Sequence, residues 1–510
     1  MSQARFASCI PLPIEHKALV TVIEKARDWG LMHGVAMRDK KHFNKDVIQV
    51  APFVLLPSPF PKTEFEKAVE LQPILNELMH KVAHNDEFLE HTLQNALQVD
   101  EFTKSLYDIW VKVRNEGITQ PISLGMLRSD IMLESRCPHT ENQCAKHTPY
   151  CSWKQVEINS IASGFGHLGP VSREIQRIKY LQSVSLGLFR SDYLMQNTES
   201  NKIKQVEFNT VASSFGAMTS FLPTMSRYIL RQLGHPDLIK NMPENKALSG
   251  LCSGITDAYD LFGVPDAVIL FVVEEVSYNI CDQRFHEFEI AEKRPDIMIH
   301  RKTLNEIFEE TSLNDKKQLI LIILSRAIKC PSIQYQLAGT KKVQQALASP
   351  GVLEKFMGSG PSTSRVRDIF TGLYSLDFDE NGERAVEMGL KDAEKFVLKP
   401  QREGGGHNVY GAEVREALQR MRHSRERAAY ILMERILPPL VNDRPGATMP
   451  PPVVDLVSEL GIFGVIIGTN EKIFHNRQVG HMLRTKLADA DEGGVAAGLG
   501  ALDSPFLVDM

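Results

Sequence analysis

The sequence predicts an α/β protein with a parallel sheet in its central part and a helical region towards its N-terminus. Residues 64–75 and 102–113 place apolar side chains three and four positions apart, which is typical of amphipathic helices. A helix-like segment from Ser249 runs through Gly263 into the apolar stretch 267–273, and helix-to-strand units of this kind build parallel sheets. Further strand-like runs follow at 395–399, 430–436 and 459–465.

Composition and charge exclude several classes of protein. The 510 residues include 58 Lys and Arg and 63 Asp and Glu, which gives a formal net charge of −5 and a pI of about 6.4. Because this chain has no global basic field to attract a phosphate backbone, we do not expect nucleic acid as a partner. With 43% hydrophobic and 24% charged residues, the chain differs from disordered, collagen-like and disulfide-scaffold proteins.

The sequence favours a cytoplasmic location with no membrane contact. The apolar runs 267–273 and 319–324 are far shorter than the roughly 18 residues that a bilayer span needs, so they predict buried strands. Pro11, Pro13 and Glu15 interrupt the N-terminus before a signal peptide's apolar region can form. The seven cysteines are few and odd in number, which favours free thiols.

One segment of the chain occurs twice. LGMLRSD at 124–130 recurs as LGLFRSD at 186–192, and KQVEIN at 154–159 recurs as KQVEFN at 204–209. The two offsets are 62 and 50 residues, so the first copy carries 12 additional residues. Because two copies are too few for a solenoid, we predict a duplicated part of one domain, at 122–183 and 184–240.

The additional residues of the first copy contain five soft metal ligands. A structural zinc site is one interpretation, but the segment has no C-x₂-C pair, and a solvated loop is the preferred interpretation. The five residues are Cys137, His139, Cys144, His147 and Cys151.

A candidate nucleotide site begins at Lys399, where a strand-like run leads into three consecutive glycines at 404–406. Glycines let backbone amides approach phosphate oxygens, the lysine adds positive charge, and Glu403 offers a carboxylate to Mg²⁺. This loop is neither a Walker loop nor a G-x-G-x-x-G motif, so a merely flexible loop is the alternative. The flanking Lys399, Glu403 and Asn408 favour the nucleotide site.

Three later segments add weaker candidates. Residues 430–436 predict a core strand whose exit can face a base, and the following strand-like run carries Glu459, which suits a metal or a ribose. In 479–486, Arg484 suits a carboxylate and Lys486 suits phosphate, with surface cations and a flexible tail as the alternative.

Five runs of sequence, in their order along the chain, resemble those of eukaryotic glutathione synthetases. They are LKPQREGGGHNVYG, QLAGTKKVQQ, SELGIFGV, VGHMLRTK and GGVAAG. The resemblance extends from VAPFVLLPSPFP over nearly the whole chain. It implies an ATP-grasp fold and a homodimeric ligase that uses ATP and Mg²⁺, two ions per active site, to join γ-glutamylcysteine to glycine in the second step of glutathione biosynthesis.

The resemblance also implies a set of metal ligands. An E-x-N motif that binds Mg²⁺ in the family occurs twice here, as Glu157 with Asn159 and as Glu207 with Asn209, and only one copy can fill the site. The second copy runs without an insert into family-like sequence, so we predict Glu207 and Asn209, with Glu403 as a further ligand.

The remaining roles are likewise implied by the resemblance. Arg190 and Arg484 are the implied catalytic residues. The implied dipeptide-binding residues are Arg190, Val211, Ala212, Ser213, Ser214, Asn279, Gln283, Arg484, Val495 and Ala496. The implied ATP-binding residues are Glu207, Lys341, Lys399, Gly404, Gly405, Gly406, His407, Asn408, Tyr410, Met433, Glu434, Arg435, Ile436, Glu459, Lys486 and Glu492.

On this resemblance we expect three regions. Residues 1–265 form the helical, ATP-grasp-associated part with the duplication, 266–345 form a truncated substrate-binding α/β domain, and 346–510 form the ATP-grasp part with its glycine-rich lid. The implied reaction activates the cysteinyl carboxylate as an acyl phosphate, which the amine of glycine displaces. Positioning and charge neutralisation supply such catalysis, and lid closure excludes water.

Two departures from the family leave other functions open. Between Lys317 and Lys329 a short apolar link replaces a longer stretch that carries a substrate-binding Arg and Tyr in the family, and Ser277 stands where an acidic residue is frequent. A second hypothesis is therefore a catalytically impaired homologue or splice variant that binds Mg·ATP and dimerises. A third is an ATP-grasp amide ligase with a changed acceptor.

Overall fold

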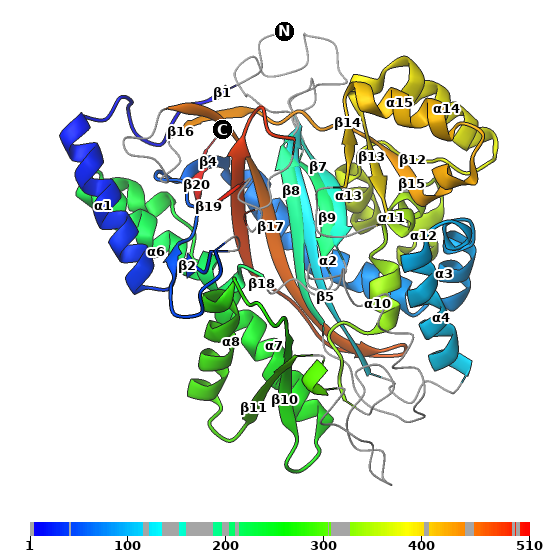
Figure 1. The fold of residues 1–510 in the computed structure, drawn as a ribbon, viewed down its shortest axis with the longest axis horizontal. Coiled ribbons are helices and arrows are strands. Elements are labelled where there is room, and N and C mark those ends of the chain that lie inside the picture. Colours follow the sequence, from blue (N-terminus) through cyan, green and yellow to red (C-terminus); the bar gives the residue numbers. More distant parts are fainter. Residues whose placement is uncertain are drawn as a thin grey trace.

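The computed structural model describes residues 5–39, 42–115, 122–134, 152–159, 187–195, 203–209, 214–303, 305–307, 327–401, 407–443, 453–491, 495 and 500–509. Over these residues the predicted α/β class is confirmed, with a nine-stranded sheet, a four-stranded sheet and three strand pairs among helices (Figure 1). The predicted strand at 319–324 lies outside the described residues.

The nine-stranded sheet runs through the middle of the molecule (Figure 1). Its order is β1–β16–β17–β5–β7–β8–β9, while β18 pairs with β17 and β19 pairs with β18. The strands are β1 (Arg5–Phe6), β5 (Ile122–Glu134), β7 (Ser152–Asn159), β8 (Gly187–Met195), β9 (Ile203–Asn209), β16 (Leu440–Asp443), β17 (Val454–Thr469), β18 (Ile473–Leu487) and β19 (Ala501–Asp503). The two predicted copies of the duplicated segment thus both form hairpins of this sheet, β5–β7 and β8–β9.

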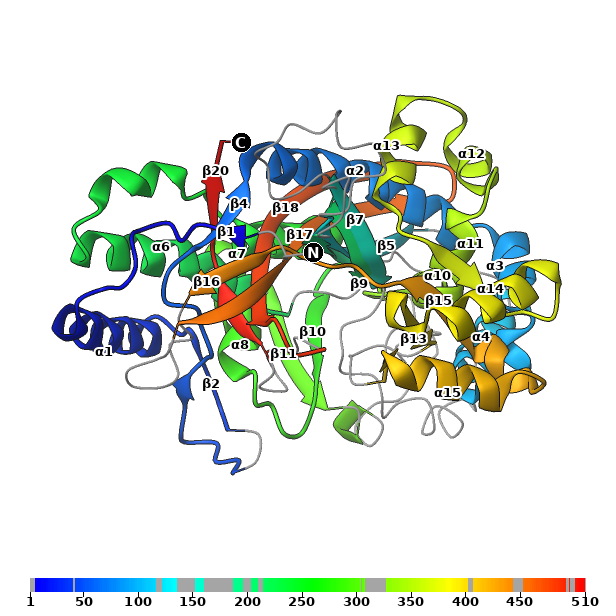
Figure 2. The same ribbon diagram turned by 90° about the horizontal axis from the view of Figure 1, so that it is seen from above.

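Helices cover both faces of the β17–β18 pair (Figure 2). The His481 ring of β18 packs edge-on against Phe65 of α2 (Lys62–Ala83), with 5.0 Å between the ring centroids. The preceding residue, Gly480, lies against Ala247, the first residue of α7 (Ala247–Phe262). Since successive residues of a strand point to opposite faces, α2 and α7 lie on opposite sides of the sheet. Next to α7, α6 (Gly216–Gln232) also packs on β18.

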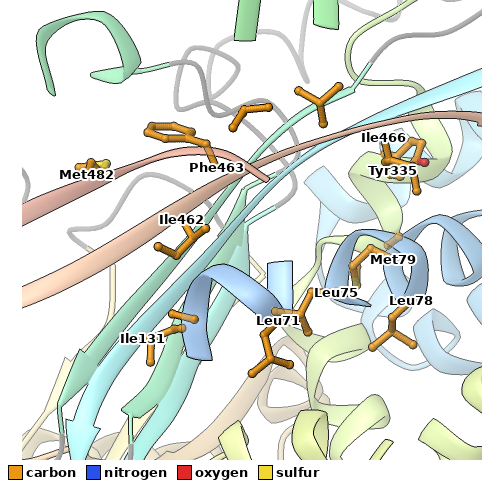
Figure 3. Close-up of a cluster of buried hydrophobic side chains, with 14 of the residues drawn as sticks. Leu71, Leu75, Leu78, Met79, Ile131, Tyr335, Ile462, Phe463, Ile466 and Met482 are labelled. Carbon is orange, nitrogen blue, oxygen red and sulfur yellow. The ribbon is translucent and has the colours of Figure 1, made fainter. Parts of the chain in front are cut away.

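The largest hydrophobic core lies on both faces of the sheet, against α2 on one side and α7 on the other, and Figure 3 shows part of it. Apolar residues of α2 repeat at spacings of three and four, as predicted for 64–75, and meet the residues of β17 that alternate towards them. All of these side chains are at most 2% exposed, and burial on this scale is the main source of the fold's stability. They include Leu71, Leu75, Leu78, Met79, Ile131, Tyr335, Ile462, Phe463, Ile466 and Met482.

A four-stranded antiparallel sheet forms a separate layer with two helices (Figure 1). Its order is β12 (Leu373–Ser375), β15 (Tyr430–Glu434), β13 (Phe396–Pro400) and β14 (Val409–Tyr410). Leu398 and Leu432 pack under α14 (Glu380–Lys391) and α15 (Ala412–Met421) in one apolar cluster. The predicted strands at 395–399 and 430–436 are confirmed as β13 and β15.

A parallel strand pair follows α7, as the sequence predicts, but its first strand, at 268–273, is not buried as expected, since Val268 is exposed and the other five residues are half-buried. Gly263, with φ of 59°, ends α7 in the left-handed conformation that glycine tolerates best, and β10 (Val268–Val273) begins five residues later. After α8 (Ile280–Lys293) the chain returns as β11 (Met298–Thr303), which is parallel to β10 in register over six residue pairs.

The remaining elements surround these layers. The helices are α1 (His16–Met32), α3 (Asp86–Leu93), α4 (Glu101–Asn115), α10 (Ile333–Ala338), α11 (Lys341–Ala348), α12 (Val352–Met357) and α13 (Pro361–Ile369). Short 3₁₀ turns lie at Ala96–Gln98, Pro236–Asn241, Ala393–Lys395 and Arg425–Ala429, and short strands are β2 (Ala36–Met37), β3 (Gln49–Val50), β4 (Ser58–Pro61) and β20 (Pro505–Val508). The helix predicted at 102–113 is part of α4.

Two other expectations concern membranes and thiols. Among the described helices, none combines the length and the apolar character that a membrane crossing requires. The cysteines are a separate matter. Among the described cysteines, Cys252 and Cys281 carry free thiols. Burial raises the pKa of the Cys252 thiol, so it remains protonated and unreactive at neutral pH.

A substitution at Gly480 tests the packing of α7 on the sheet. Its φ is 154°, and a Cβ atom there would lie 2.5 Å from the backbone of Ala247. We expect Gly480→Ala to lower the free energy of unfolding by about 1–3 kcal/mol, because the start of α7 must move. Gly360→Ala is the control, since nothing lies within 4 Å of its Cβ position; it should cost less than about 1 kcal/mol. Equal losses in urea unfolding would contradict this packing.

Candidate functional site

Two predicted phosphate-binding lysines lie on neighbouring elements of the four-stranded layer. Lys399 is near the end of β13 and Lys341 is the first residue of α11, and they are 4% and 3% exposed. Gln401 joins these elements, since its Oε1 accepts a hydrogen bond from the backbone N–H of Lys342 at 2.9 Å and its Nε2 donates to the carbonyl of Ala429 at 3.4 Å. The start of α11 is thereby fixed against the end of β13.

The adjacent Lys342 has a structural role. Its Nζ lies 2.5 Å from Oδ2 of Asp377 and 2.8 Å from Oγ of Ser375. Because this buried charge is neutralised within the protein, Lys342 anchors α11 to the last residue of β12 and to Asp377 just after it.

The segment predicted to meet the base of ATP forms the end of β15. Met433 and Ile436 are buried in one small apolar cluster. Glu434 Oε2 accepts a hydrogen bond from the N–H of Gly372 at 3.2 Å, and the N–H of Arg435 donates to the carbonyl of Lys395 at 2.7 Å. The exit of β15 is therefore held by hydrogen bonds on the β12 and β13 sides.

Three predicted residues of the glycine-rich motif are described. The Asn408 side chain donates to the Tyr410 hydroxyl at 3.2 Å, and Tyr410 pairs with Val397 in β13. His407 is exposed. The motif therefore rejoins the four-stranded layer beside the strand that carries Lys399.

Two predicted residues, Lys486 and Arg435, contact one acidic residue, Asp491, and two others, Glu459 and Arg484, pair with each other on the strands β17 and β18. Glu459 and Arg484 are directly opposite each other in the β17–β18 ladder and form a salt bridge, with side chains 11% and 19% exposed. Lys486 follows Arg484 by two residues and so lies on the same face of β18. It donates a hydrogen bond to the carbonyl of Asp491 at 2.7 Å, and Arg435 lies 3.3 Å from the Asp491 carboxylate. The nucleotide-side residue Arg435 is thus joined to the residues of β18.

Burial lowers the pKa of Lys486 to about 8, while Glu459 and Asp491 oppose this shift. The ammonium group is therefore charged at neutral pH and loses its proton at mildly alkaline pH. A lysine in this state is suited to bind phosphate.

Three of the predicted dipeptide residues, Ser214, Asn279 and Gln283, lie at the junction of α6 and α8. Asp282 in the first turn of α8 accepts hydrogen bonds from the backbone amides of Phe215, Ala217 and Met218, at 2.5, 3.0 and 3.1 Å. Asn279, which precedes α8, donates to Asp282 at 3.3 Å. This carboxylate therefore fixes the start of α6, which closely follows Ser214, to the start of α8. Asn279 is the N-cap residue of α8, and Gln283 lies in its first turns.

A half-buried arginine organises the other side of Gln283. Arg301 of β11 donates to the Gln283 side chain, to Glu287 at 2.7 Å and to the Ser277 hydroxyl at 3.0 Å. Ser277, where an acidic residue is frequent in the family, is thus part of an arginine-centred network. The predicted residue Val495 is 3% exposed in the apolar cluster that also contains Met218.

The predicted metal ligands are described by their backbone alone. Arg190 pairs with Asn209 and Asp192 pairs with Glu207 across β8 and β9. Glu207 and Asn209 lie two positions apart and so on one face of β9, and carboxylate and amide oxygens are ligands that Mg²⁺ accepts. No group of three or more His, Cys, Asp or Glu side chains that could hold a metal occurs in the part of the chain that the structure describes.

Several predictions lie outside the described residues. These include the glycine-rich lid, part of the dipeptide pocket, the cysteine-rich insert and the shortened link. The residues are Cys137, His139, Cys144, His147, Cys151, Val211, Ala212, Ser213, Glu403, Gly404, Gly405, Gly406, Glu492, Ala496 and 308–326.

Sequence analysis missed three residues that position the site. They are Asp282, Gln401 and Asp491. For Asp282 the sequence contains a signal, because an acidic residue three positions after Asn279 suits the first turn of a helix. Gln401 and Asp491 act across elements far apart in sequence, and no local pattern marks them.

The chain is similar over nearly its whole length to proteins of one family. Residues 16–180 and 168–507 match the family described as eukaryotic glutathione synthase, ATP binding domain. The chain is 36% identical to glutathione synthetase of Rattus norvegicus over 97% of this chain and 98% of the relative. It is 35% identical to the enzymes of Xenopus laevis and Homo sapiens, over 96% and 97% of this chain and 98% of each relative.

A solved structure shares the fold. It is a glutathione synthetase-like effector from Globodera pallida in its apo form, with a TM-score of 0.70 and 22% identity over 98% of this chain and 100% of that chain. Family match and near full-length identity together show that the chain belongs to the eukaryotic glutathione synthase family.

Proposed function

We propose that this protein joins γ-glutamylcysteine to glycine with the cleavage of ATP, by way of an acyl phosphate. The observation that carries the proposal is identity of 35–36% to glutathione synthetases over nearly the full length of both chains. The position of the predicted lysines supports it, since Lys341, Lys399 and Lys486 lie on the elements that surround the proposed nucleotide site.

Each described residue has a proposed task in this reaction. Lys341 and Lys399 bind the phosphates of ATP, and the buried backbone between Met433 and Ile436 receives the base. Arg484 holds the dipeptide carboxylate, with Glu459 orienting the guanidinium group across the ladder. Positioning of this kind supplies most of the catalysis in phosphoryl transfer.

The metal ligands are proposed from the donor set. Glu207 and Asn209 would hold Mg²⁺, with Glu403 as a further ligand, and two ions per site are proposed. When bound, Mg²⁺ neutralises charge on the phosphates of ATP. Arg190, opposite Asn209, would bind the dipeptide beside this metal.

The finer statements about assembly and location are also proposals. We propose a cytosolic homodimer, and the domain boundaries at residues 265 and 345 remain predictions. The hypothesis of an impaired homologue depends on the shortened link, which is outside the described residues. Ligase activity is favoured because the relatives to which the chain is similar over its full length are glutathione synthetases.

Release of ADP by the purified protein tests the proposal. With Mg²⁺ and ATP, we expect sustained release to require γ-glutamylcysteine and glycine together, because the carboxylate of the dipeptide forms the acyl phosphate and the amine of glycine displaces its phosphate to complete each turnover. Mass spectrometry should identify glutathione in the same reaction. ATP binding without release would support the impaired homologue, and release with another amine in place of glycine would support a changed acceptor.

The pH dependence of ATP binding tests Lys486. The ammonium group is protonated below its pKa of about 8 and neutral above it. We therefore expect the Kd for Mg·ATP to rise about tenfold between pH 7 and 9 in the wild type, and to stay nearly constant in Lys486→Arg, which remains charged. Lys395→Arg, at an exposed lysine paired with Asp392, is the control and should follow the wild type. The same slope in Lys486→Arg would exclude this role.

A further inference from the structure

The position beside β17 has room for one strand. Between residues 460 and 468, β17 pairs with β18 along one edge and with β5 along the other. A strand has two hydrogen-bonding edges, so both are filled over this length. β8 lies close to β17 as well, but the ladder pairs β17 with β5.

The two hairpins repeat the same register. In β5–β7, Arg128 is opposite Asn159 and Asp130 is opposite Glu157. In β8–β9, the corresponding pairs are Arg190 with Asn209 and Asp192 with Glu207. Each hairpin therefore presents an arginine, a glutamate and an asparagine at identical positions of its ladder.

The two copies also lie side by side at equivalent residues. β5 and β8 are parallel and pair Met126 with Leu188 and Leu127 with Phe189. Each of these pairs consists of a residue and its own counterpart 62 positions later. A shift of the second hairpin into the place of the first would keep an antiparallel pairing with β17 and retain the Arg-Ser-Asp and Lys-Gln-Val-Glu runs, while most other positions of the strands exchange one apolar or aromatic residue for another.

The first hairpin is integrated into the protein around the proposed site. Ile131 and Leu133 of β5 are fully buried in the largest core. β7 contacts α11, which begins at Lys341, and α13, where the Lys154 Nζ donates to the carbonyl of Asp368 at 2.9 Å. The motif of Glu157 and Asn159 therefore lies on a strand that contacts a nucleotide-binding element of the proposed site.

We propose that the two hairpins are alternative occupants of one position beside β17, and that Arg128, Glu157 and Asn159 form a second functional set equivalent to Arg190, Glu207 and Asn209. This inference rests on the proposed function. At any moment one hairpin serves the site and the other lies next to it. A variant that lacks one set therefore remains active in those molecules whose other hairpin occupies the position beside β17.

Alanine variants of the two arginines in the full-length protein test this proposal. We expect Arg128→Ala and Arg190→Ala each to keep part of the ligase rate, with residual rates that add up to about the wild-type rate. The double variant should lose about 100-fold or more, because no arginine remains. Ser129→Ala and Ser191→Ala, at the adjacent equivalent positions, are matched controls, and melting temperatures show that all variants fold.

Two results would overturn the proposal. The first is that one of the single variants loses as much of the ligase rate as the double variant, because then one copy alone functions; the second is that the double variant retains the wild-type rate. If the wild type makes no glutathione, the proposed function is wrong. The hairpin proposal is then tested by the Mg²⁺-dependent rise in melting temperature that ATP causes. Glu157→Gln and Glu207→Gln should each keep part of that rise, and their combination should lose it. Loss in one single variant, or no Mg²⁺-dependent rise in the wild type, would overturn the hairpin proposal.

Discussion

The pairing of β17 with β18 is the constraint on which the rest of the structure depends. The two strands pair from Leu456 and Leu487 at one end to Gly468 and Ile473 at the other, so a single long ladder crosses the molecule. Glycines let the covering helices approach it: Gly464 lies against Asn76 of α2, and Gly480 lies against Ala247 of α7. A side chain at either glycine would separate a helix from the sheet. The ladder thus fixes the helices on both faces and, at its end, the pair Glu459 and Arg484.

The same ladder explains how distant parts of the chain form one site. Arg484 and Lys486 are two residues apart and so share a face of β18, while Asp491 connects Lys486 to Arg435 at the exit of β15. On the other side, Asp282 connects α8 to the start of α6, which itself packs on β18. Each connection places a buried or partly buried charge opposite a partner, and such charges are costly to leave unpaired. The site is therefore rigid where it meets the sheet.

Much of the fold could be predicted from the sequence, because hydrophobic periodicity is a local property. The helices around 64–75 and 102–113 and the strands β10, β13 and β15 followed from spacing alone, and the family followed from long motifs. The motif that carries Arg484 was harder, since surface cations were an equal interpretation until the structure placed it in a strand with Leu483 fully buried. Asp491 and Gln401 could not be predicted, because each acts on a partner that only the tertiary fold brings near. The repeat could be read from the sequence, but the equivalent strand pairing of the two hairpins could not be predicted from it.

Hydrogen–deuterium exchange of the full-length protein tests most directly the claim that the site is assembled on this ladder. Mg²⁺ with a non-hydrolysable ATP analogue and γ-glutamylcysteine should slow exchange in peptides that cover 430–436, 455–463 and 481–490, and in 279–287 when the dipeptide is present. The central β17 amides should be among the slowest in the free protein, because both of their neighbours are hydrogen-bonded strands. Ligand-induced protection confined to other parts of the chain, or rapid exchange of β17 in the free protein, would contradict the account.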